Sequence, residues 1–121
     1  MTEQADISRM SVLQLEAEIV EKESYESILS MLAEECSECA HASLKLARIR
    51  RKESPTPESE REVREHLIEE VSDVMNIISI LSDQYEYELD KKICVSFDIM
   101  KFKLRRWVRR LREKENDQNT K

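Results

Sequence analysis

The stretch SMLAEECSECAHASLKLARI, residues 30 to 49, predicts an amphipathic helix with one acidic residue on its apolar side. Successive residues lie about 100° apart around a helix axis, which places Glu35 in the middle of the apolar face and Glu38 at its edge. A carboxylate that faces the interior is unfavourable unless it is protonated or paired. The apolar residues on the same face are Ile28, Met31, Leu32, Cys39, Ala42 and Leu46.

A second stretch, HLIEEVSDVMNII at residues 66 to 78, repeats this arrangement. Glu70 lies on the apolar face and Asp73 lies at its edge, whereas other acids on this helix project away. No lysine or arginine occurs between residues 23 and 44 or between 65 and 90, so salt bridges within the helices cannot compensate these acids. The apolar neighbours of Glu70 on its face are Val63, Leu67, Val74, Ile77 and Leu81.

The composition indicates one all-α domain of 121 residues. Glycine is absent and proline occurs only at Pro55 and Pro57, whereas sheets usually need glycine-rich turns. We expect an antiparallel helical hairpin, extended to a four-helix bundle whose core is completed by oligomerisation. Residues 1–7 and 113–121 are expected to be flexible.

Four helices are expected from the capping residues and the apolar periodicity. The first is capped by Ser8 or Ser11 and ends near Lys22, and the second runs from the cap Ser24 to about Arg51. The third has Thr56 as N-cap and Pro57 at its first position, and ends at Gln84 or Tyr85. The fourth begins near Asp90 and ends after Leu111.

The net charge of −6 is distributed unevenly along the chain. Residues 101–121 contain nine lysines or arginines and three acids, so an acidic body carries a basic end. This asymmetry suits an anionic substrate bridged by a metal, or nucleic acid. No signal peptide or apolar run of about 20 residues is evident, and three cysteines do not form a disulfide framework. We therefore expect a soluble, cytoplasmic protein with no membrane partner.

Four carboxylates on facing helices, those of Glu35, Glu38, Glu70 and Asp73, would repel one another. Either they are protonated or a cation lies among them, and Mg²⁺ prefers such oxygen ligands. A looser packing, in which the acids line a wet groove, is the alternative. The CxxC of Cys36 and Cys39 lies in mid-helix and favours packing, and for His66 a partly buried structural role is favoured over contact with the site.

These motifs resemble those of a known group of enzymes. LAEECSECAHASLKLAR (residues 32–48) followed by HLIEEVSDVMNII is similar to the EExxE and ExxD motifs of the MazG-like all-α nucleoside triphosphate pyrophosphohydrolases. That superfamily includes dimeric dUTPases and phosphoribosyl-ATP pyrophosphohydrolase. KFKLRRWVRRL (residues 101–111) resembles the basic helix of small members, and the resemblance covers residues 25–112.

The resemblance implies Mg²⁺-dependent hydrolysis of nucleoside triphosphates to monophosphate and pyrophosphate, as in nucleotide-pool housecleaning, with Mn²⁺ as a possible substitute. It implies a homodimer or a dimer of dimers, with Glu35, Glu38, Glu70 and Asp73 as metal ligands and Glu34 as the extra leading acid. Glu34 or Glu38 is then the expected proton acceptor.

Lys103 and Arg106 are the residues expected to contact the substrate, although a solvated charged surface is the alternative for both. The preferred base stays open, because ESYESILSML (residues 23–32) departs from the related proteins before the first motif. Two other functions are kept: a catalytically silent binding module of the same fold, and a nucleic-acid binder that uses its basic helix.

Overall fold

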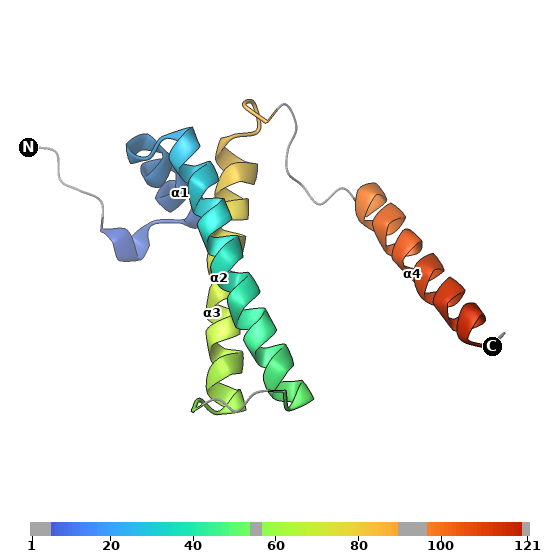
Figure 1. Cartoon of the computed structure of the whole chain (residues 1–121). Helices are drawn as coiled ribbons and strands as arrows, with labels where there is room; N and C mark the ends of the chain where they lie inside the picture. The colour runs from blue at the N-terminus through green and yellow to red at the C-terminus, as the bar shows by residue number, and fades with distance from the viewer. Residues whose placement is uncertain (1–5, 54–56, 90–96, 120–121) are drawn as a thin grey trace, which may run out of the picture.

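The computed structural model describes residues 6–53, 57–89 and 97–119, and within these residues the regular structure is entirely helical. A short 3₁₀ helix, η1 (Ile7–Arg9), precedes four α-helices: α1 (Val12–Lys22), α2 (Tyr25–Arg51), α3 (Glu60–Gln84) and α4 (Phe97–Asn119). The two long helices α2 and α3 lie side by side as an antiparallel hairpin, and α1 lies at one end of it (Figure 1). The predicted all-α fold is confirmed.

Serine caps define where the first two α-helices begin. Ser11 forms a capping box at the start of α1: its hydroxyl accepts from the Gln14 amide at 3.1 Å, and its own amide donates to the Gln14 side chain at 2.8 Å. Ser24 caps α2 by accepting from the Ser27 amide at 3.0 Å. Ser11 and Ser24 are both residues that the sequence predicted as N-caps.

The third helix begins later than predicted, at Glu60 instead of Pro57. Its N-cap is Ser59, whose hydroxyl accepts from the Glu62 amide at 3.1 Å. Glu60 and Glu62 lie in the first turn, where negative charge is favourable at a helix N-terminus. This cap replaces the proposed cap Thr56, which lies outside the described residues.

The fourth helix also differs from the expected bounds. It continues to Asn119, so the predicted end after Leu111 is wrong. Residues 112–119 are mostly arginine, glutamate, lysine and glutamine, which favour helix even with no apolar surface to bury. The expected start near Asp90 lies outside the described residues.

The core lies where α1 meets the hairpin. Ile28, Ile80, Leu81 and Tyr85 form its buried centre, and the rings of Tyr25 and Tyr85 are 4.8 Å apart. Farther along the hairpin, Ala42 of α2 and Val63 of α3 are also buried. The acidic motifs lie on α2 and α3 between these apolar contacts, so the packing of the hairpin determines their geometry.

The fourth helix lies apart from the hairpin (Figure 1) and makes no extensive contact with the other described helices. Its apolar stripe is between 43% and 61% exposed and consists of Met100, Leu104, Trp107, Val108 and Leu111. Among the described residues, no helix has the length and apolar character needed to cross a membrane. Within one chain, the helices that pack on one another are α1, α2 and α3.

Candidate functional site

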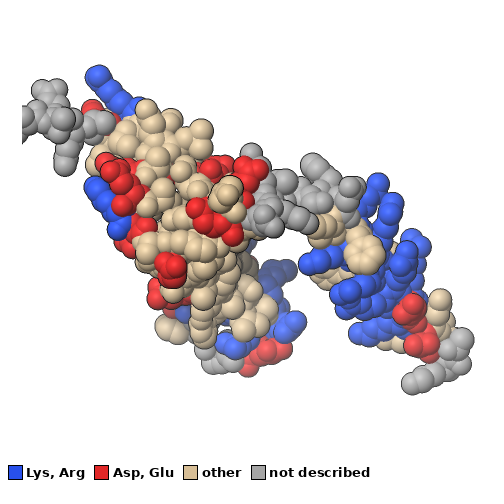
Figure 2. Space-filling view, turned by 90° about the horizontal axis from the view of Figure 1, so that it is seen from above, with Lys and Arg blue, Asp and Glu red and all other residues tan. Residues whose placement is uncertain are grey.

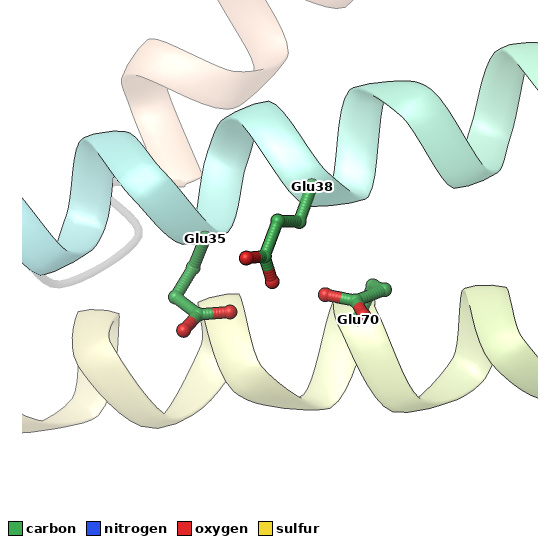
Figure 3. Close-up of side chains that lie close together, drawn as sticks. All are labelled: Glu35, Glu38 and Glu70. Carbon is green, nitrogen blue, oxygen red and sulfur yellow. The ribbon is translucent and has the colours of Figure 1, made fainter.

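Three carboxylates meet between the two long helices. Glu35 and Glu38 extend from α2 and Glu70 extends from α3, and their side chains point toward one another (Figure 3). One oxygen from each of the three lies within 4.8 Å of the others. We call Glu35, Glu38 and Glu70 the carboxylate trio.

The burial of these acids follows the helix-face prediction. Glu70 is only 8% exposed, Glu35 is half-buried, and Glu38 and Asp73, placed at the stripe edges, are exposed. One oxygen of Glu35 (Oε2) and one of Glu70 (Oε2) are buried and have no hydrogen-bond partner among the described residues. Buried polar atoms in proteins are normally paired, so the trio lacks a compensating group.

The electrostatics of the trio disfavour three negative charges. Burial raises the pKa of Glu35, and the charges of Glu38, Asp73, Glu70 and Glu34 raise it further, in that order. Burial likewise raises the pKa of Glu70, followed by the charge of Glu38 and a hydrogen bond with that side chain. Both shifts have the causes expected for carboxylates held together away from solvent.

His66 contributes the one opposing effect on Glu70. Its Nε2 lies 3.5 Å from Glu70 Oε1, one helical turn away, and its charge lowers the pKa of Glu70. The imidazole is exposed, so the structural, partly buried role favoured by the sequence is wrong for this residue. His66 instead contacts the trio from the solvent side.

The donor set fits a divalent cation. The trio offers carboxylate oxygens, which hard cations such as Mg²⁺ prefer, and Mg²⁺ commonly keeps several waters beside a few carboxylates. The unpartnered oxygens of Glu35 and Glu70 are the atoms that such an ion would satisfy. Protonation of these two acids is the competing way to relieve the same charge.

The other residues expected at the site are placed differently. Asp73 is not part of the trio, but its charge acts on both Glu35 and Glu70. Glu34 is exposed on α2 and also acts on Glu35 through its charge. Lys103 and Arg106 are exposed on α4, apart from the hairpin (Figure 1), so one chain does not bring them to the trio.

An open cleft of about 430 Å³ adjoins the trio. Glu35 and Asp73 line it, and Lys22 of α1 contributes a positive charge that sequence reasoning did not single out. Its volume lies within the usual range for small-ligand sites. The remaining lining residues are Ile19, Glu23, Ile28, Met31, Asn76, Ile77 and Ile80.

The structure also reveals an acid that sequence reasoning missed. Glu16 of α1 is 5% exposed, and its Oε1 accepts a hydrogen bond of 2.8 Å from Ser79 Oγ of α3. Helix periodicity could have identified Glu16, because Val12, Ile19 and Val20 lie on the same helix face. Glu16 is therefore surrounded by apolar residues in the way that Glu35 is. Cys36 and Cys39 are free thiols, the first exposed and the second half-buried.

No protein-family model, curated protein or solved structure matches this chain. The MazG-like resemblance therefore stays an expectation that rests on the two acidic motifs, and the geometry of the trio and the cleft is the basis for a functional proposal.

Proposed function

We propose that this protein is a Mg²⁺-dependent nucleoside triphosphate pyrophosphohydrolase. The observation that supports this most is the pair of buried carboxylate oxygens, Glu35 Oε2 and Glu70 Oε2, that lack a partner among the described residues. The two side chains extend from facing helices (Figure 3), and Glu35 lines an open cleft. Unpaired carboxylate oxygens destabilise a purely structural core, whereas a cation that bridges to phosphates requires such oxygens as ligands. The two acidic motifs support the same assignment.

The reaction is a hydrolysis at the α-phosphorus. A water oxygen bonds to this phosphorus, the bond from it to the α–β bridging oxygen breaks, and pyrophosphate leaves. Mg²⁺ held by the trio and Asp73, with Mn²⁺ as a substitute, would neutralise charge on the phosphates and acidify a water. Glu38 suits the role of proton acceptor, because it belongs to the trio and is exposed to solvent, and Glu34 is the alternative. Lys22 lines the cleft, and its Nζ lies 3.9 Å from Glu18 Oε1. Its ammonium group would exchange this exposed ion pair for a phosphate of the substrate.

We further propose that the working form is a homodimer or a dimer of dimers. The exposed apolar stripe of α4 needs a partner, and lysines and arginines gather over α4 whereas the body carries acids (Figure 2). Pairing of α4 with the acidic body of a second copy would satisfy both features. It would also bring Lys103 and Arg106 toward a trio, where they can contact phosphates.

The assignment fits a cytoplasmic housecleaning role, since nucleoside triphosphates are abundant there and the thiols of Cys36 and Cys39 would stay reduced. This part of the proposal rests on the proposed reaction alone.

Product analysis tests the reaction. The protein is incubated with a panel of ribo- and deoxyribonucleoside triphosphates and Mg²⁺, and the products are separated by anion exchange. We expect monophosphate and pyrophosphate, abolished by Glu38→Gln or Glu70→Gln. Glu69→Gln is the matched control, because Glu69 is exposed, adjoins Glu70 and is not part of the trio.

Three results would contradict the proposal: release of inorganic phosphate with diphosphate, turnover that survives Glu70→Gln, or no turnover across the panel by folded protein. The last result would favour the silent binding module.

A further inference from the structure

A second cavity, of about 250 Å³, lies at the contact of α1 with α3. Ile19, Asn76 and Ile80 line both this cavity and the larger cleft that adjoins the trio, so the two are neighbouring parts of one depression. Its polar lining consists of Glu16, Asn76 and Ser79, and its apolar lining includes Val12 and Leu15. The proposed reaction does not use these polar groups.

Glu16 carries the strongest sign of a missing ligand here. Oε1 is paired with Ser79, but Oε2 is buried and has no partner among the described residues. Burial raises the pKa of Glu16, the hydrogen bond from Ser79 lowers it, and the charge of Asp83 and a hydrogen bond with that side chain raise it further; Asp83 Oδ2 lies 3.4 Å from Ser79 Oγ. Glu16 lines the cavity and its buried Oε2 lacks a donor, so a ligand in the cavity that offers an N–H group can pair with this carboxylate.

The spacing of the lining residues along α3 indicates the length of a ligand that would span both cavities. Asp73 lines the cleft beside Glu35, Asn76 lines both cavities, and Ser79 lines the second. From Asp73 to Ser79 the helix rises about 9 Å, at 1.5 Å per residue. This length is comparable to that of a nucleoside 5′-phosphate measured from its phosphate to the far edge of its base.

We propose that Glu16, together with Asn76 and Ser79, binds the base of the nucleotide and selects guanine. The proposal rests on the proposed function for the position of the phosphates. Guanine presents two adjacent N–H donors, N1–H and the N2 amino group, to the carboxylate of Glu16. Its O6 can accept from the amide of Asn76, while Ile19 and Ile80 provide apolar contact for the ring.

The other bases fit this lining less well. Adenine and cytosine place an acceptor nitrogen beside their single amino group, and that nitrogen would face the carboxylate without a hydrogen. Uracil and thymine have one N–H between two carbonyl oxygens, so a carbonyl would meet the negative charge. A buried acceptor left opposite another acceptor is strongly unfavourable, which is how such a site rejects the wrong base.

The test compares kcat/KM for the four deoxyribonucleoside triphosphates in three proteins. We expect the wild type to prefer dGTP, and Glu16→Gln to reduce that preference roughly 10- to 100-fold, because the amide turns an N–H toward the N–H groups of guanine. Glu21→Gln is the control, since Glu21 is exposed on the same helix as Glu16 and lines neither cavity, and it should leave the ranking unchanged.

A binding measurement separates this inference from the proposed reaction. Calorimetric titration with dGMP, dAMP and dCMP requires no turnover, and we expect dGMP to bind most tightly and Glu16→Gln to weaken it. Selective dGMP binding without any hydrolysis of the triphosphates would support the base site and contradict the proposed reaction. Hydrolysis with equal rates for all bases, or with a ranking that Glu16→Gln leaves intact, would overturn the base site alone.

Should Glu16→Gln not fold, Asn76→Asp at an exposed position replaces it. This variant removes the donor to O6 and must lower the preference for guanine; an unchanged preference would overturn the inference.

Discussion

The apolar stripe of α4 leads to a quantitative prediction for Trp107→Ala. Trp107 is 61% exposed in the single chain. A tryptophan buries about 200 Å² when covered, so roughly 120 Å² remain to be buried by a partner. At about 25 cal/mol per Å² this is worth about 3 kcal/mol for each Trp107 in the interface. We expect Trp107→Ala to raise the dimer dissociation constant about 100-fold for each Trp107 in the interface, and so about 10⁴-fold in a symmetric dimer that buries two.

Sedimentation velocity over a series of protein concentrations measures this effect. Phe102→Ala is the matched control, because Phe102 is 62% exposed but lies on the opposite side of α4 from the stripe. It should leave the dissociation constant nearly unchanged. A wild type that stays monomeric at every concentration would refute the reasoning, and so would a Phe102→Ala effect as large as that of Trp107→Ala.

Two further predictions concern stability. In metal-free protein, the pKa values of Glu35 and Glu70 are raised above their ordinary value of 4.5, so the folded state holds more protons than the unfolded state above that pH. The free energy of unfolding should therefore fall as pH rises from 4.5 through the raised pKa values. Urea denaturation midpoints measured over this pH range should fall less steeply in the Glu35→Gln/Glu70→Gln double variant than in the wild type. Identical pH profiles for the two proteins would contradict this prediction. Leu81→Ala, at a position 1% exposed, should lower the free energy of unfolding by about 3 kcal/mol in urea denaturation, whereas Leu44→Ala, at 51% exposure, should have little effect. An equal loss at Leu44 would contradict the core as described.

The helical hairpin and its acids could be predicted because helix periodicity relates sequence directly to a face. Glu35 and Glu70 fall among apolar residues at helical spacing, and the structure places both at the contact of α2 with α3. The same test applied to Glu16 would have found it, since Val12 and Ile19 flank it on one face. It was missed because Glu16 belongs to no paired motif.

Other features depend on information that periodicity does not contain. Asp73 lies at the edge of the apolar face of α3, as Glu38 does on α2, but which of these two acids joins the trio depends on the rotation of one helix against the other. The start of α3 depended on which hydroxyl reaches a free amide, and Ser59 does so in place of the predicted Thr56. The stripe of α4 predicts packing, but the described part of the chain supplies no partner for it, so this stays a prediction.

The central claim is that the carboxylate trio holds a divalent cation, and calorimetric titration of the metal-free protein with Mg²⁺ tests it directly. The account predicts a saturable site that releases protons on binding, because Glu35 and Glu70 must lose any proton they carry. It also predicts that Glu70→Gln abolishes this site and that Glu69→Gln leaves it intact. Equal Mg²⁺ binding by wild type and Glu70→Gln, or no binding by folded wild type, would contradict the claim.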